Sequence, residues 1–189
     1  GDWSSDVCSS DLMLNFYQFT QIIENNKTFT IYCDLDGVLV DLERGVREKL
    51  GINKPMSRLE MMRSLARMRR NSETELVEFF QNLPWTEGGH ELWSFITPHN
   101  PIILTGGAEE ANAIGQGKNA WVQKNLNIPI TKVIHESNKS KYAGSDKILI
   151  DDYDKNIREF QNAGGIGILH TNTNNTIFQL ESILSQINI

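Results

Sequence analysis

Five short apolar runs, each separated from the next by enough chain for a helix, constrain the fold more than any other feature. They cover residues 28–33, 101–104, 132–135, 147–150 and 166–169, and the first is rich in β-branched and aromatic residues. Helical patterns lie between and after the later runs, at residues 108–126, 154–163 and 176–186. Apolar strands that alternate with helices predict a parallel sheet covered on both faces. We therefore expect an α/β fold, a Rossmann-like parallel sheet of about five strands with helices on both faces.

The segment between the first two runs has a different pattern. It lacks an apolar strand and is expected to form helices at residues 42–50, 57–69, 72–82 and 89–96. This pattern divides the chain into a core domain of residues 13–41 and 101–189 and a small helical cap of residues 42–100, inserted after the first strand. Residues 1–12 resemble the translation of a sequencing-adapter oligonucleotide, so we expect a non-native leader there and a natural start at Met13.

Composition narrows the classes of protein that fit. A net charge of −6 argues against binding to a nucleic-acid polymer, because such proteins usually carry a basic face. Cys8 lies in the expected leader, which leaves Cys33 without a partner for a disulfide and favours a reducing, cytoplasmic setting. No apolar run approaches the length of a membrane span, so no membrane partner is expected.

Polar residues follow three of the apolar runs, at the sheet edge where α/β proteins bind ligands. They comprise four carboxylates and a hydroxyl beside a glycine, joined by a lysine in the loop before the fourth run: Asp34, Asp36, Thr105, Gly106, Lys141, Asp151 and Asp152. Carboxylates crowded in this way repel one another unless a cation lies among them, and oxygen ligands favour Mg²⁺. A metal beside a lysine and free N–H groups suits a phosphoryl group.

These motifs resemble those of the haloacid dehalogenase (HAD) superfamily of phosphohydrolases. DLDGVLVD at residues 34–41, ILT at 103–105, Lys141 and ILIDD at 148–152 match its four motifs in order. The resemblance implies a magnesium-dependent phosphatase in which Asp34 is the nucleophile and forms an aspartyl-phosphate. It also implies that Asp36 protonates the leaving oxygen and later activates water.

The same resemblance implies the remaining contacts. Thr105, Gly106 and Lys141 would bind the phosphoryl oxygens. Asp34, the backbone carbonyl of Asp36, and either Asp151 or Asp152 would bind Mg²⁺, and the family pattern favours Asp152.

Within the superfamily, the chain is most similar to the 5′(3′)-deoxyribonucleotidases, through DLDGVLVDLERGV, PWTEGGHELW and KNAWVQKNL. That likeness implies a (deoxy)nucleoside monophosphate as substrate. Gly106 and Gly107 stand where those enzymes have a hydroxyl residue and proline, and the cap is shorter. A HAD phosphatase for a sugar phosphate or another small metabolite is the alternative, and a non-hydrolytic phosphoacceptor domain is a third interpretation.

Several other polar residues are expected to have structural roles. Asp41 is expected to cap the helix at residues 42–50, because aspartate is a preferred N-cap, and contact with the site is the alternative. Lys118 is expected on a helix surface, and contact with the phosphate is the alternative. Cys33 is expected in the core, and the histidines lack the spacing of metal ligands: His90, His99, His135 and His170.

Overall fold

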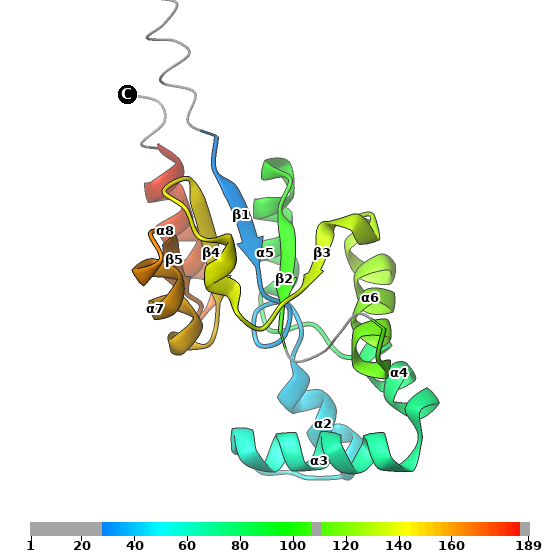
Figure 1. The fold of residues 1–189 in the computed structure, drawn as a ribbon. Helices are drawn as coiled ribbons and strands as arrows, with labels where there is room; N and C mark the ends of the chain where they lie inside the picture. Colours follow the sequence, from blue (N-terminus) through cyan, green and yellow to red (C-terminus); the bar gives the residue numbers. More distant parts are fainter. Residues whose placement is uncertain (1–27, 107–110, 186–189) are drawn as a thin grey trace, which may run out of the picture.

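The structure is a computed structural model that describes residues 28–106 and 111–185. Five strands form one parallel sheet in the order β3-β2-β1-β4-β5, which confirms the predicted fold class (Figure 1). The strands are β1 (Thr30–Cys33), β2 (Ile102–Thr105), β3 (Val133–His135), β4 (Lys147–Asp151) and β5 (Ile166–Leu169). Central β1 pairs Cys33 with Ile103 of β2 and with Ile150 of β4. The carboxyl ends of these three strands are therefore level, and the residues that follow them are neighbours.

Alternate residues of the strands point to opposite faces of the sheet, and each face has its own helices. On one face, Tyr32 and Leu149 pack against Ile157 and Phe160 of α7 (Asp154–Asn162). On the other face, strand residues pack against α5 (Gly89–Ile96) and α8 (Thr173–Leu184), which contact each other. The buried residues that join the second face to these helices are Ile31, Cys33, Ile148, Ile150, Leu92, Ile96 and Leu180. Cys33 is fully buried, as predicted.

Three helices of the segment between β1 and β2 lie beyond the carboxyl ends of the strands (Figure 1). They are α2 (Leu42–Leu50), α3 (Arg58–Asn71) and α4 (Glu73–Gln81), and α4 packs along α6 (Ala113–Leu126) of the core. The predicted cap at residues 42–100 also included α5, which the structure instead places against α8. The reason is that α5 buries Leu92, Trp93 and Ile96, so its apolar face belongs to the core.

Serine side chains cap the starts of α3 and α4. Ser57 accepts a hydrogen bond from the backbone N–H of Glu60, and the Glu60 carboxylate accepts one from the N–H of Ser57. This reciprocal pair is a capping box, which satisfies two N–H groups that the first turn leaves open. Ser72 caps α4 in the same way through the N–H of Glu75. The turn between α3 and α4 is therefore fixed by local sequence.

Some predictions fall outside the described residues. They are the leader at residues 1–12, the start of the core at 13–27, the first three residues of the helix predicted at 108–126, and the last residue of the helix predicted at 176–186. Within the described residues, α6 begins after its cap Asn112 and α8 begins at Thr173, each displaced from the predicted start. Across residues 28–106 and 111–185, each helix is too short or too polar to cross a membrane.

Candidate active site

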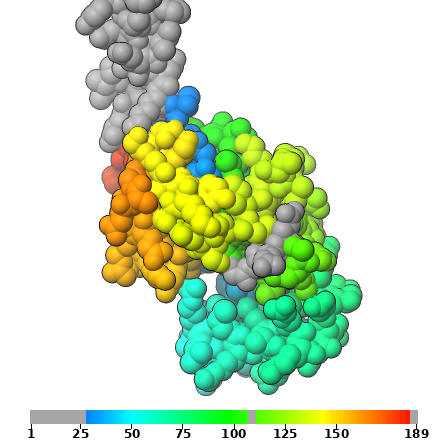
Figure 2. All heavy atoms as spheres, in the orientation of Figure 1, coloured from blue at the N-terminus to red at the C-terminus, as the bar shows by residue number. Residues whose placement is uncertain are grey.

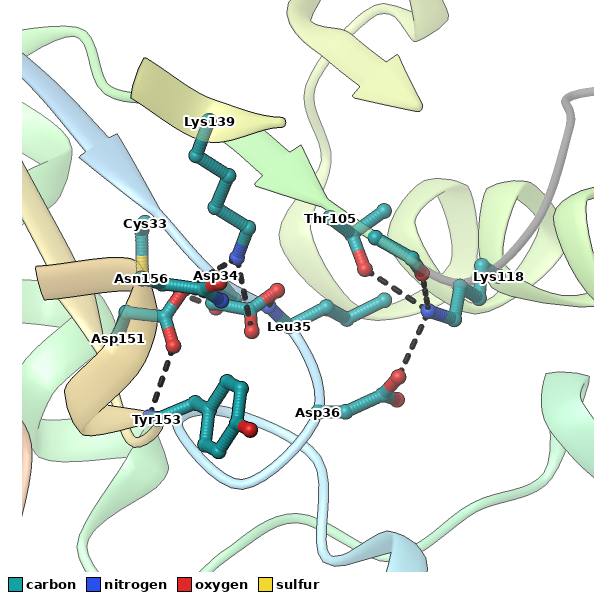
Figure 3. Close-up of polar contacts among 11 residues, drawn as sticks. Cys33, Asp34, Leu35, Asp36, Thr105, Lys118, Lys139, Asp151, Tyr153 and Asn156 are labelled. Atoms are coloured by element: carbon teal, nitrogen blue, oxygen red, sulfur yellow. Dashed lines mark hydrogen bonds and ion pairs between the residues drawn. The ribbon is translucent and has the colours of Figure 1, made fainter. Parts of the chain in front are cut away.

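A tight turn after β1 carries the first two aspartates. Asp34 extends the strand by donating its N–H to the carbonyl of Ile150 at 2.9 Å, and its Oδ1 accepts the N–H of Leu35 at 2.8 Å. The chain then reverses at Gly37, whose φ of +78° is a conformation that residues with a Cβ avoid. A glycine at this position therefore permits the turn. The side chains of Asp34 and Asp36 leave this turn toward different partners (Figure 3).

Asp34 meets a buried lysine that the sequence analysis passed over. Lys139 lies in a short 3₁₀ helix (Lys139–Tyr142), and its Nζ is 2.9 Å from Oδ2 of Asp34 and also contacts Oδ2 of Asp151. The lysine side chain is only 2% exposed. Burial works against its charge, but the two carboxylates prevail and raise the pKa of Lys139 above its usual range. Lys139 is therefore an ammonium ion held between two strand ends.

Lys141, the lysine that was predicted to bind phosphate, does not reach this group. Its side chain is 59% exposed and forms an ion pair with Glu136. The geometry of the 3₁₀ helix explains the difference, because residues three apart lie on the same side of such a helix. Tyr142 packs its ring 5.7 Å from the ring of Tyr32 in the core, so Lys139 shares the inward side. Lys141 lies on the outward side.

The two aspartates at the end of β4 differ in how their oxygens are occupied. Asp151 is fully buried, and it accepts hydrogen bonds from Tyr153 N–H at 2.8 Å and from the side chain of Asn156 at 2.9 Å, besides Lys139. Asp152 is exposed and has no hydrogen bond or ion pair within the described part of the chain. Its carboxylate instead lies over Gly37, where a Cβ would come within 2.2 Å of Oδ2.

Asp152 lies where three other aspartates crowd negative charge. Burial by its neighbours, followed by repulsion from Asp34, Asp151 and Asp36, raises the pKa of Asp152 to about 7. One oxygen each from Asp34, Asp151 and Asp152 lie within 4.8 Å of one another, an arrangement that can hold a metal ion. With Asp36, four carboxylates face the ammonium groups of Lys139 and Lys118, so the formal charge is −2 when all four are ionised. An oxygen-only donor set with this excess fits a hard divalent cation such as Mg²⁺.

Asp36 points away from that group, toward α6. Its Oδ2 is 2.7 Å from Nζ of Lys118, which also donates to Thr105 Oγ1 at 2.9 Å and to the carbonyl of Gly106 at 2.8 Å (Figure 3). Lys118 is 2% exposed rather than on the helix surface, where the sequence analysis had favoured it. The structure thus brings Asp36, Thr105 and Gly106 together around one nitrogen atom.

A large cavity opens over both groups. It has a volume of about 1270 Å³ and lies between the core and the cap, where Figure 2 shows a notch beside the cyan residues of α2 and α3. Asp34, Asp36, Lys118, Lys139 and Asp152 line its core side. Its cap side is mostly apolar and includes two arginines: Arg58, Met61, Met62, Leu65 and Arg69.

The residues expected to be structural mostly are. Asp41 caps α2 by accepting the N–H of Arg44 at 2.9 Å, which confirms that prediction. His90 stacks on Trp85, and His135 contacts Asn119. His170 forms a hydrogen bond with Thr176, and burial lowers the pKa of the His170 imidazole below its usual range. In the described chain, no histidine belongs to a group of possible metal ligands.

Comparisons with known proteins give distant structural likenesses only. No protein-family model and no curated protein sequence matches the chain. Among solved structures, a hydrolase from Streptococcus pneumoniae is similar at 17% identity over 84% of this chain and 99% of that one, with a TM-score of 0.49.

A HAD hydrolase of family IA, variant 3, from Entamoeba histolytica is 15% identical over 85% of this chain and all of that one, with a TM-score of 0.46. A β-phosphoglucomutase from Clostridium difficile is 16% identical over 84% and 96%, with a TM-score of 0.44. These likenesses are too distant to assign a function.

Proposed function

We propose that this chain is a magnesium-dependent phosphomonoesterase of the HAD type, in which Asp34 takes up the phosphoryl group, and that its substrates are (deoxy)nucleoside monophosphates. One observation carries the proposal: a nearly buried carboxylate at the end of the central strand is held by a buried ammonium group, inside a cluster of acidic side chains. Such a carboxylate is a nucleophile already oriented toward the cavity, and phosphoryl transfer is the reaction that needs this combination of charges.

The residues divide the reaction between them. An oxygen of Asp34 attacks the phosphorus and the bond to the leaving oxygen breaks. Asp36 starts this step in its protonated form, with the proton on Oδ1, the oxygen that Lys118 does not contact, and gives that proton to the leaving oxygen. Water then attacks the aspartyl-phosphate, Asp36 takes up its proton, and inorganic phosphate leaves Asp34 free. Lys139 contacts Asp34 directly and so lies where a transferred phosphoryl group carries its charge. We therefore assign to Lys139 the phosphate-binding role that the sequence analysis gave to Lys141.

Thr105 has a hydroxyl oxygen that accepts a hydrogen bond from Lys118, which leaves its own hydrogen as a donor. The side chain is fully buried behind the cavity wall, so a phosphoryl oxygen would have to move neighbouring atoms to accept that hydrogen. For the metal, Asp34 and Asp152 are the better side-chain ligands, with the backbone carbonyl of Asp36, because the oxygens of Asp151 already accept three hydrogen bonds. Bound there, Mg²⁺ would supply positive charge to the phosphoryl oxygens and to the attacking carboxylate.

The cavity supports a substrate larger than a bare phosphate ester of a small alcohol. Its volume of about 1270 Å³ accommodates a nucleoside monophosphate, and its cap side offers Met61, Met62 and Leu65 to an apolar group. Arg58 lies over the ring of Tyr153, 4.1 Å from its centroid, and lines the same cavity. A planar base next to these methionine, arginine and tyrosine side chains is the interpretation that we favour.

A phosphate-release screen tests the proposal. The protein is assayed with nucleoside monophosphates, sugar phosphates and p-nitrophenyl phosphate, each with Mg²⁺ and with EDTA. We expect repeated turnover that needs Mg²⁺, is highest on nucleoside monophosphates and is abolished by Asp34→Asn. Asp154→Asn, the same change of charge at an exposed site on α7, should keep full activity.

Other outcomes of the screen contradict parts of the proposal. Faster release of phosphate from sugar phosphates than from nucleoside monophosphates would mean that sugar phosphates are the substrate class. Labelling of Asp34 by a phosphoryl donor without repeated phosphate release would indicate a phosphoacceptor domain. Full activity of Asp34→Asn would remove the nucleophile and the proposal with it.

A further inference from the structure

Lys118 lies in the site but has no place in the phosphoryl chemistry described so far. It extends from α6 toward the core, is 2% exposed, and has three contacts at ordinary hydrogen-bond distances: Asp36 Oδ2, Thr105 Oγ1 and the Gly106 carbonyl. An ammonium group has three N–H donors and no acceptor. All three donors are therefore used, and Lys118 can bind a phosphoryl oxygen only by giving up one of these contacts.

The carboxylate of Asp36 depends on this lysine. Its Oδ1 is buried and has no hydrogen-bond partner within residues 28–106 and 111–185. Its Oδ2 has the contact with Lys118 at 2.7 Å. The position of the proposed acid is therefore set by one charged hydrogen bond, together with the turn at Gly37. Charged hydrogen bonds of this length are the strong ones, so a single contact is sufficient to fix the side chain.

We propose that Lys118 is a positioning residue: it holds the carboxylate of Asp36 and the hydroxyl of Thr105 in fixed places without binding the substrate itself. The inference rests on the proposed function, because it takes Asp36 as the acid and Thr105 as a ligand of the phosphoryl group. It assigns to Lys118 a role in the position of two other side chains.

The chemistry explains why these two side chains need a common anchor. The leaving oxygen, which receives the proton, and the oxygens that Thr105 would bind are attached to the same phosphorus. The acid and the hydroxyl must therefore be close together and keep their separation during the reaction. Hydrogen bonds from one nitrogen at 2.7 Å and 2.9 Å meet that need. A misplacement of a catalytic group by about 1 Å can cost about 10²-fold in rate.

The test compares two esters of similar size whose leaving groups differ. Single-turnover transfer is measured with p-nitrophenyl phosphate, which leaves readily without a proton, and with benzyl phosphate, whose alkoxide needs one. Lys118→Met should slow transfer from benzyl phosphate on the order of ten- to a hundredfold more than transfer from p-nitrophenyl phosphate. The inhibition constant for inorganic phosphate should rise only on the order of threefold, through the loosened Thr105 hydroxyl, because the lysine itself binds no phosphoryl oxygen.

Two further variants complete the design. Lys124→Met removes a lysine of the same helix that is bonded to exposed Asn82, and it should behave as the wild type. Lys118→Gln keeps a donor without the charge, so it should restore part of the rate on benzyl phosphate. It also provides the comparison if Lys118→Met does not fold, since folding of each variant is checked by circular dichroism.

The possible results separate this inference from the proposed function. Equal losses on both esters, together with weaker inhibition by phosphate, would make Lys118 a phosphate ligand and overturn the positioning role. Unchanged rates in Lys118→Met and Lys118→Gln would overturn it as well. If the wild-type protein transfers the phosphoryl group of neither ester, the proposed function itself fails.

Discussion

Without a bound metal ion, the stability of the folded protein should depend on pH, and Asp152 should contribute to that dependence. Its pKa is raised to about 7, compared with about 3.9 for an unperturbed aspartate, because neighbouring atoms keep water from part of the carboxyl group and because other aspartates surround it. Between these values the folded protein keeps a proton that the unfolded chain has lost. This proton therefore stabilises the folded protein. Its contribution to the free energy of unfolding is complete below about pH 4 and is lost as the pH rises through about 7.

The expected magnitude follows from the exposure of the group. A full proton would change the free energy of unfolding by about 1.4 kcal/mol for each pH unit. Because Asp152 is exposed at the mouth of the cavity, water screens the repulsion, and we expect a total on the order of 1–2 kcal/mol. Asp152→Asn removes the charge, so in EDTA it should raise the stability at pH 8 by that amount. This corresponds to about 2–8 °C in melting temperature.

The assay is thermal unfolding of the wild type and the variant at pH 4 and pH 8, with EDTA and with Mg²⁺. The two proteins should melt alike at pH 4, and Mg²⁺ at pH 8 should stabilise the wild type more than the variant. Asp154→Asn makes the same change in net charge but breaks an exposed ion pair with Arg158, so it should not stabilise the protein. The reasoning is refuted if Asp152→Asn in EDTA is no more stable than the wild type at pH 8.

Two more substitutions test other parts of the site. Lys139→Met should destabilise the protein by about 3 kcal/mol or more in urea unfolding, because it leaves buried carboxylates unpaired, whereas Lys141→Met at its exposed ion pair should change the stability by less than about 1 kcal/mol. Equal effects would contradict the placement of the two lysines. Gly37→Ala should weaken Mg²⁺ binding in calorimetry, because its Cβ would displace the carboxylate of Asp152, and unchanged binding would exclude Asp152 as a ligand.

The sheet was predictable from the sequence because its signal is repeated. Each of the five apolar runs is weak alone, but their alternation with helices permits few arrangements, and the structure has the expected strands at each of them. The prediction was less accurate for α5, which shares a helical pattern with its neighbours in the cap. Its apolar residues meet α8, a helix more than seventy residues later in the chain, and local sequence does not encode that contact.

The site was harder to predict where a side chain's direction decides its role. Lys139 and Lys141 are equally plausible in a loop, and only the anchoring of Tyr142 in the core selects the first. For Lys118 a signal was present. It stands three residues after Gly115 and three before Trp121, on the buried face of α6, where a lysine needs a charged partner. The aspartates that follow β1 provide that partner, but their distance in the chain hides the pairing.

The contact between α4 and α6 connects the cap to this lysine and gives a further prediction. A Cβ at Gly117 would lie 2.5 Å from Cβ of Phe80 and 2.8 Å from the backbone oxygen of Val77. Neither atom is the flexible end of a side chain, so Gly117→Ala must push the two helices apart. Overpacking of this kind costs about 1–3 kcal/mol, and better helix propensity returns up to about 1 kcal/mol. We expect a net loss of stability on the order of 1 kcal/mol.

A second glycine provides the matched control. Gly45 also lies inside a helix, but its Cβ would meet the terminal methyl group of Leu83, which can rotate away. Gly45→Ala should therefore cost less stability than Gly117→Ala in urea unfolding. Because Lys118 follows Gly117 on the same helix, Gly117→Ala should also shift the Lys118 ammonium group from Asp36 and slow transfer from benzyl phosphate more than from p-nitrophenyl phosphate. If Gly117→Ala is destabilised but keeps the wild-type ratio of these two rates, α6 adjusts without moving the Lys118 ammonium group. The position of the cap would then have no influence on Asp36, the proposed acid.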